Sequence, residues 1–414
     1  MALDPGANQS PPRPDGPTPP LRVLLVTPTV NTFPGGIAVQ AERFAAALNQ
    51  DVRVQLDIQP IVPEARGVFR RLQQVPVART LVTAVLYWSQ LIRRIPRYDV
   101  IHVNSARFSS FMISSLPAVV IAKICGRRVI LNYRNGDLER ELRQFRIFRR
   151  LLAWPDVLVV PSGFLAAVLR SAGLEAAILA NQVDTGLFRY RERTSLRPRF
   201  LSCRHFEDFY DVPTVIRAFA RIQQVHPDST LVVAGQGSQE AKIRELVAKL
   251  RLNGVTFVGQ VGAEAMPALY DDADILLNSS KVDNAPNSLI EALTSGLPIV
   301  STDAGGIRFI VADGDTGWLV PVSDDAALAN AAIRALGETG RTLAMARAGR
   351  ADAEKRFDWD HLRDRWLELY RGGSLNNGPL TPRPGEPAEP GRTQPSRTGN
   401  ADQTVEAPRS SAGG

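Results

Sequence analysis

The sequence predicts an α/β fold with two domains, and three observations lead to this prediction. The chain has 414 residues, which is long for a single domain. Its hydrophobic fraction of 44% is sufficient for well-packed cores. Short apolar runs typical of buried parallel strands recur along the chain, and glycine turns or helical patterns follow several of them. The clearest runs lie at 21–27, 100–103, 129–131, 157–160 and 231–234.

The most informative stretch covers residues 283–306, DNAPNSLIEALTSGLPIVSTDAGG. Asn287 is expected to begin and cap a helix, Gly296 ends it, and a short apolar strand follows. Loop, helix and buried strand in this order form half of a doubly wound unit, whose ligands lie near helix N-termini. The sequence therefore predicts an anion near Asn287 and Ser288, and a Glu291 carboxylate that accepts hydrogen bonds from sugar hydroxyls. A solvated acid on an ordinary helix is the alternative for Glu291.

This stretch resembles the signature of retaining glycosyltransferases of family 4. The family pattern is an acid, seven residues, Glu, then A-x-x-x-G-x-P-V/I-V and a Gly-Gly turn. Here Asp283 and Glu291 are the two acids, and Gly305-Gly306 is the turn. The first acid of the family is usually Glu, so Asp283 keeps the charge with a shorter reach. The resemblance extends over about residues 21–371 and implies the GT-B fold, with two facing Rossmann-like domains and a cleft between them.

The resemblance also implies the domain boundaries. Residues 21–190 would form an N-terminal acceptor domain and 191–357 a C-terminal nucleotide-sugar domain, with a last helix at 358–372 returning to the first domain. Residues 1–20 contain seven prolines and no signal-peptide pattern, and 373–414 are similarly polar. Both ends are therefore expected to be disordered tails.

The catalytic residues that the resemblance implies are Asp283 beside the transferred sugar, Glu291 beside the ribose and Arg204 beside the diphosphate. The donor would be a UDP- or GDP-linked sugar, held by glycine turns, a helix start and backbone groups around the nucleobase. The expected donor-binding residues are Gly35, Gly36, Gly259, Gln260, Val261, Asn287, Ser288 and Leu289.

Several positions depart from the family pattern. Tyr210 or a neighbour stands where a lysine usually holds the diphosphate, and Lys281 is a candidate to compensate. Arg134 replaces a histidine that contacts the transferred sugar; it cannot accept a proton, but its guanidinium can hold a phosphate or sugar oxygen. Asp137, His102 and Tyr210 are further candidates for sugar or acceptor contacts. A packed core histidine is the alternative for His102.

No metal or redox cofactor is predicted. The D-x-D sequence at 272–274 ends a helix before a strand, so we interpret it as a coincidence. The glycine turn at 235–237 lacks the third glycine of a dinucleotide fingerprint, which has Glu240 in its place. Cys125 and Cys203 fall in different halves, which argues against a disulfide scaffold or zinc cluster and favours a reducing compartment.

The net charge of +7 is carried mainly by arginine. No basic segment has the pattern of a nucleic-acid motif, so nucleic acid is the least favoured partner. Two basic amphipathic segments, 66–97 and 138–154, predict either contact with an anionic membrane surface or packing on the sheet with solvated arginines. No apolar run is long enough to span a membrane. A cytoplasmic enzyme, peripheral on the inner face of the membrane, is expected.

The sequence thus predicts a retaining glycosyltransferase that uses a nucleotide sugar. By family habit, the acceptor would be a polysaccharide or a polyprenyl-linked intermediate of cell-envelope or exopolysaccharide synthesis. Two alternatives remain: a nucleotide-sugar epimerase of the same architecture, and a non-catalytic relative that binds the nucleotide sugar. Analysis of the product distinguishes an epimerase, which yields an isomer of the nucleotide sugar, from a transferase. Binding of the nucleotide sugar without turnover would identify the non-catalytic relative.

Overall fold

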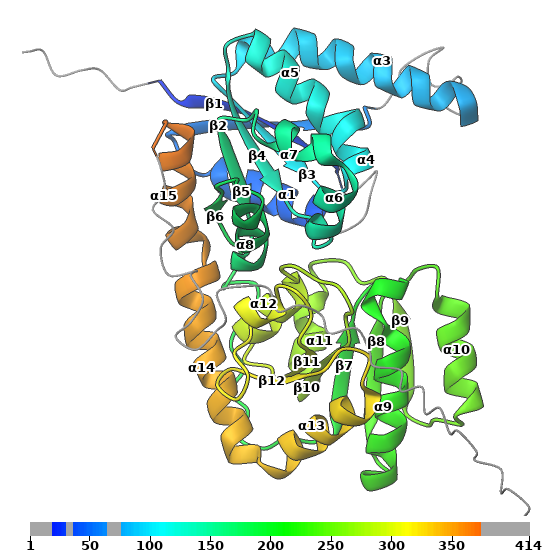
Figure 1. The fold of residues 1–414 in the computed structure, drawn as a ribbon. Coiled ribbons are helices and arrows are strands. Elements are labelled where there is room, and N and C mark those ends of the chain that lie inside the picture. Colours follow the sequence, from blue (N-terminus) through cyan, green and yellow to red (C-terminus); the bar gives the residue numbers. More distant parts are fainter. Residues whose placement is uncertain (1–18, 30–35, 64–75, 374–414) are drawn as a thin grey trace, which may run out of the picture.

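The computed structural model describes residues 19–29, 36–63 and 76–373. These residues form two α/β units, each built on a six-stranded sheet, stacked one above the other in Figure 1. Neighbouring strands in both sheets run parallel, as the continuous apolar runs predict. No helix within these ranges is both long and apolar enough to cross a bilayer.

The first sheet has the strand order β2-β1-β3-β4-β5-β6. The strands predicted at 21–27, 100–103, 129–131 and 157–160 are all present, whereas the sequence analysis did not predict β2 or β6. The bounds are β1 Leu21–Thr27, β2 Val54–Pro60, β3 Val100–Ser105, β4 Arg128–Tyr133, β5 Val157–Val160 and β6 Ala177–Ile178.

Helices cover both faces of this sheet. Along β1, Leu24 and Val26 belong to one buried cluster and Val23 and Leu25 to another, because successive side chains of a strand point to opposite faces. This burial on both sides explains the continuous apolar run. The principal helices are α1 Gly36–Leu48, α3 Pro76–Arg94, α5 Leu116–Ile124, α6 Leu138–Gln144, α7 Arg146–Leu152 and α8 Gly163–Ser171.

The second sheet has the order β12-β11-β10-β7-β8-β9. Its strands are β7 Arg199–Cys203, β8 Thr230–Ala234, β9 Val255–Gly259, β10 Ile275–Asn278, β11 Ile299–Thr302 and β12 Trp318–Val320. Its helices are α9 Val212–Val225, α10 Glu240–Lys249, α11 Met266–Asp272, α12 Asn287–Thr294 and α13 Asp325–Gly337.

Two final helices, α14 Thr339–Phe357 and α15 Trp359–Tyr370, run back from the second unit to the first (Figure 1). Asp358 caps α15 by accepting a hydrogen bond from the backbone N–H of Asp360. The apolar face of α15, with Leu362 and Trp366, shares a buried cluster with β1. The last helix therefore contributes to the core of the first unit.

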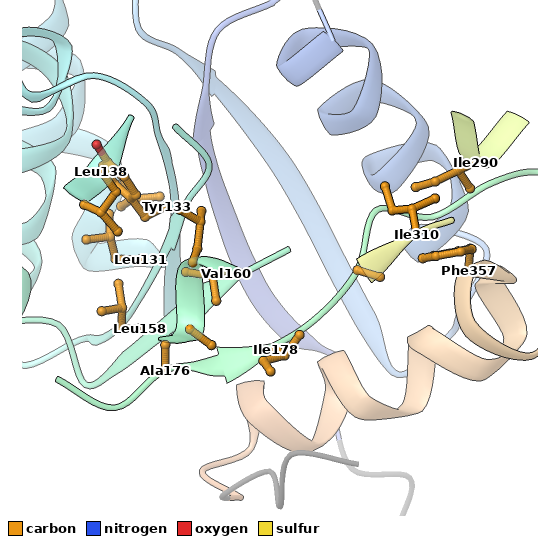
Figure 2. Packing of buried hydrophobic residues seen from close by; sticks show 14 of the residues in the cluster. Leu131, Tyr133, Leu138, Leu158, Val160, Ala176, Ile178, Ile290, Ile310 and Phe357 are labelled. Atoms are coloured by element: carbon orange, nitrogen blue, oxygen red, sulfur yellow. The ribbon is translucent and has the colours of Figure 1, made fainter. Parts of the chain in front are cut away.

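One buried cluster is continuous across the junction of the two units. It contains Val160 and Ile178 of the first sheet together with Ile290, Ile310 and Phe357, which Figure 2 shows grouped at its other end. Burial of these side chains fixes the position of α12 against the first unit, and α12 carries Glu291, the second acid of the signature.

Candidate active site

A cleft of about 820 Å³ lies between the two units. It is lined by α1, the connecting segment 182–187, the loops after β7 and β9, the first turns of α12, and residues 358–360. Loops at the carboxyl ends of parallel strands are the usual ligand sites of such sheets. The predicted site residues that line the cleft are Arg204, Gln260, Val261, Asn287, Ser288 and Glu291.

Glu291 is buried in the wall of this cleft, so the solvated-acid interpretation is wrong. Its Oε1 accepts a hydrogen bond from Nη1 of Arg43 at 2.9 Å, and its Oε2 accepts one from the Tyr270 hydroxyl at 2.9 Å. Burial raises the pKa of Glu291, while Arg43 and Tyr270 oppose this shift. The carboxylate is thus held by one group from each unit, and a ligand hydroxyl must compete with Arg43 for it.

Arg204 follows β7 and lies nearly buried beside the start of α12. Its Nη2 donates to the Asp283 carboxylate, and its Nη1 donates to Ser288 Oγ at 3.2 Å. Asp283 also accepts hydrogen bonds from Ser280 Oγ at 3.1 Å and from the Asn284 N–H at 3.0 Å. Asp283 does not line the cleft; it neutralises the cation that does.

The Asp283 loop is held by the glycine turn of the signature. The N–H of Gly306 donates to the Asp283 carbonyl at 3.0 Å. Gly305 has φ +54°, and a Cβ at Gly305 or Gly306 would collide with the backbone of Asp283 or Asn284. The two glycines are therefore needed for the close approach that places the acid beside Arg204.

The residue at the usual lysine position, Tyr210, and the candidate to compensate for it, Lys281, are differently placed. The Tyr210 ring stacks under the guanidinium of Arg204, with 3.9 Å from Cζ to the ring centroid, and burial raises the pKa of Tyr210. Lys281 pairs with Asp208 and Asp211 at 3.6 and 3.8 Å and does not line the cleft. The prediction that Lys281 compensates for the missing lysine is not supported by this geometry.

The helix start at α12 differs from the prediction in one respect. Pro286 is the N-cap, and no side chain caps the helix. The Asn287 side chain instead accepts a hydrogen bond from Asn181 Nδ2 at 2.8 Å. Asn287 and Ser288 do line the cleft, and the first N–H groups of a helix have no intrahelical acceptor. Leu289 is fully buried in the core and does not reach the cleft.

The predicted nucleobase segment is only partly exposed to the cleft. Gln260 and Val261 line it, whereas Gly259 ends β9 with φ +70° and does not. Gly36 is the first residue of α1, while Gly35 falls outside the described residues.

His102 lies in the core of the first unit and does not reach the cleft. Its Nδ1 is 2.8 Å from the Tyr370 hydroxyl, and its ring stacks on Trp366 with a centroid separation of 4.8 Å. Burial lowers the pKa of His102 to about 3. The packed-core alternative describes this residue; its contacts join α15 to β3.

The other sugar or acceptor candidates, Arg134, Asp137 and Tyr210, do not line the cleft either. Partial burial of Arg134 lowers its pKa to about 10, and its Nη2 donates to the Asn181 side chain. Asn181 continues this chain to Asn287, so Arg134 contacts the start of α12 indirectly. Asp137 precedes α6 and lies 3.6 Å from Arg140.

Sequence reasoning missed Arg43 and Tyr270, the two groups that hold Glu291. Both lie in helices, where the spacing of apolar residues indicates which face is buried but not which distant residue a side chain contacts. Arg43 is separated from Glu291 by 248 positions. The D-x-D sequence is structural: Asp274 is buried and accepts hydrogen bonds from Arg191, Arg197 and Arg199. Within the described residues, no group of three or more His, Cys, Asp or Glu side chains is placed to hold a metal.

Part of the chain is similar in sequence to known glycosyltransferases. Residues 191–352 match the family model described as glycosyl transferases group 1. The chain is similar to the phosphatidyl-myo-inositol mannosyltransferase of Mycobacterium leprae, with 23% identity over 84% of this chain and 96% of the relative. It is also similar to the glycogen synthase of Mycobacterium tuberculosis, with 28% identity over 47% of this chain and 48% of the relative.

Among solved structures, the fold is similar to that of Anabaena Alr3699/HepE, crystallised in complex with UDP-glucose. The TM-score is 0.66 at 17% identity, over 85% of this chain and 99% of the other. The predicted architecture of two facing Rossmann-like domains, with a cleft between them, is therefore confirmed.

Proposed function

We propose that this protein, whose residues 191–352 match the group 1 glycosyltransferase model, transfers a sugar from a nucleotide-sugar donor with retention of configuration. The observation that carries the proposal is the position of Glu291. This buried carboxylate lies in the interdomain cleft, one turn of α12 beyond Ser288, which Arg204 contacts. The carboxylate proposed to accept hydrogen bonds from the ribose is thus about one helical turn, roughly 5 Å along the axis, from the groups proposed to donate hydrogen bonds to the diphosphate.

In the proposed complex, the ribose hydroxyls donate to Glu291 and the nucleobase lies against residues 260–261. The diphosphate lies between Arg204 and the start of α12, where free N–H groups and the helix dipole favour negative charge. Arg204 must then exchange some of its hydrogen bonds to Asp283 for hydrogen bonds to the phosphates. This stabilises the leaving group as the bond from the sugar C1 to the phosphate oxygen breaks, without requiring a metal.

Arg43 supplies a second positive charge in this proposal. The basic side chains lining the cleft among the described residues are Arg43, Arg204 and His205, and Tyr210 provides no charge. When ribose hydroxyls donate hydrogen bonds to Glu291 in place of Arg43, the Arg43 guanidinium becomes available to bind the diphosphate. Because Arg43 belongs to the first domain, this exchange links donor binding to contact between the domains.

The acceptor is proposed to be a glycan or a polyprenyl-linked intermediate of the cell envelope, bound at the first domain on the cytoplasmic side. Similarity over most of its length to a mannosyltransferase named for a phosphatidyl-inositol acceptor supports a lipid-linked hydroxyl acceptor. Membership of family 4 is part of the proposal. The identity and anomeric configuration of the product test which sugar is transferred and whether its configuration is retained.

A thermal-shift screen of UDP-, GDP- and ADP-linked sugars tests the donor, followed by product analysis with the stabilising donor. Stabilisation in the wild type that Glu291→Gln abolishes, together with transfer to an acceptor, supports the proposal. An isomerised nucleotide sugar as product would establish an epimerase instead. Donor binding without hydrolysis, transfer or isomerisation would establish a non-catalytic relative.

A further inference from the structure

Helix α3 carries an exposed apolar stripe on the part of the first domain farthest from the second domain (Figure 1). Leu81, Val85, Trp88 and Ile92 are 69%, 56%, 45% and 60% exposed. Their spacing of four, three and four positions places them on one face of the helix. This stripe is unusual because exposed apolar residues of a soluble domain are normally scattered.

The opposite side of α3 is already used for folding. Tyr87 and Leu91 are buried, and the Tyr87 hydroxyl donates to the Ser114 carbonyl at 2.7 Å. Met112 and Ile113, which precede Ser114, are also exposed. The core therefore does not explain the stripe.

Positive charge accompanies the stripe. Arg79, Arg93 and Arg97 are exposed, and the sequence contains no acid between residues 66 and 97. Arg94 differs: it donates to the Ile58 carbonyl and to Gln59 at 3.0 and 2.9 Å, so it stabilises the fold. Exposed Arg79 and Arg93 on α3, and Arg97 in the turn directly after it, thus accompany an apolar strip that includes a tryptophan.

We propose that α3 docks the protein reversibly on an anionic membrane surface, with its apolar stripe in the headgroup region and Arg79, Arg93 and Arg97 on the lipid phosphates. Basic amphipathic helices with tryptophan bind anionic bilayers in this way. A second copy of the chain fits less well, because a twofold contact would place the same arginines opposite one another without acids to pair them.

The second basic segment behaves differently. In α6 and α7, Leu138, Phe148 and Leu152 are buried in the core of the first domain. The packing alternative therefore applies to the apolar face of residues 138–154, and the docking surface is assigned to α3.

Co-sedimentation of the full chain with vesicles tests the proposal. Wild-type protein should bind vesicles of phosphatidylglycerol with phosphatidylcholine at low salt, and bind those of phosphatidylcholine alone weakly. The variant Leu81→Gln, Trp88→Gln, Ile92→Gln should lose this binding. Val225→Gln, which removes an equally exposed apolar side chain from α9, should retain it.

A charge variant, Arg79→Gln with Arg93→Gln and Arg97→Gln, should weaken binding to the anionic vesicles by roughly a hundredfold, since each arginine contributes about fivefold. Salt should weaken wild-type binding because the Debye length is about 10 Å at 0.1 M. The matched control removes three exposed charges from the second domain: Lys242, Lys249 and Arg347 to Gln. Both sets should retain donor binding, because none of these residues lines the cleft.

Four results would overturn the proposal: absence of wild-type binding to anionic vesicles, equal binding to neutral vesicles, equal loss in the control variants, or unchanged binding in the stripe variant. Concentration-dependent dimerisation that the stripe variant abolishes, without vesicle binding, would assign the surface to a second copy instead. Loss of vesicle binding with intact donor binding is the outcome that supports docking through α3.

Discussion

Arg204 and Asp283 form a pair whose two members should affect ligand binding in opposite directions. Arg204→Ala removes a charge-assisted donor, so affinity for the free nucleoside diphosphate should fall by about 1.5–3 kcal/mol. This corresponds to roughly a 10- to 150-fold increase in Kd. Asp283→Asn removes the carboxylate that occupies Nη2 of Arg204, so diphosphate affinity should stay the same or increase, even though sugar transfer is lost.

Stability should follow a different rule from affinity. Arg204→Ala leaves the Asp283 carboxylate with two remaining donors, Ser280 Oγ and the Asn284 N–H. Breaking a buried pair on one side costs about 3–5 kcal/mol. Because these side chains are 10% and 12% exposed, we expect a smaller loss, about 2 kcal/mol. The double variant with Asp283→Asn should recover most of this stability but none of the affinity.

Calorimetric titration with the nucleoside diphosphate, together with urea unfolding of the four proteins, measures both quantities. An Arg204→Ala affinity within twofold of wild type would place the diphosphate elsewhere. Equal weakening by Asp283→Asn would show that Asp283 itself contacts the ligand, contrary to the geometry.

Further variants at three positions test separate parts of the structure. Glu291→Ala should abolish transfer without changing the circular dichroism spectrum, and a wild-type rate would remove Glu291 from the site. Burial raises the pKa of Glu291, so the folded state binds its proton more tightly than the unfolded state, and this group's contribution to stability should decline as pH rises above the ordinary value of 4.5. The difference in unfolding free energy between wild type and Glu291→Gln, followed against pH, should show this decline, and a rise would contradict it. Tyr370→Phe removes the hydrogen bond with His102, so the free energy of unfolding should fall by about 1 kcal/mol while the transfer rate stays unchanged. A large loss of transfer activity would indicate that His102 belongs to the active site. Lys281→Gln should leave diphosphate affinity unchanged, because Lys281 pairs with Asp208 and Asp211; a tenfold loss would show that it reaches the ligand.

Much of the fold was predictable because its signals are local. The strands at 100–103 and 157–160 were found from apolar runs that need no knowledge of distant residues. The signature at 283–306 placed a helix and a strand correctly, although it assigned the cap to Asn287 where Pro286 holds that position. Short strands such as β6 Ala177–Ile178 escaped prediction, because two residues carry no periodicity.

The sequence by itself determined most of the strands and singled out Glu291 and Arg204 as candidate site residues. Only the tertiary structure decided their partners, because Arg43 meets Glu291 across 248 positions. It also separated two amphipathic segments that the sequence could not distinguish: the apolar face of 138–154 is buried, whereas α3 buries Tyr87 and Leu91 and leaves a second apolar stripe facing solvent. Periodicity specifies that a helix has an apolar face, but what covers that face depends on where the rest of the chain folds.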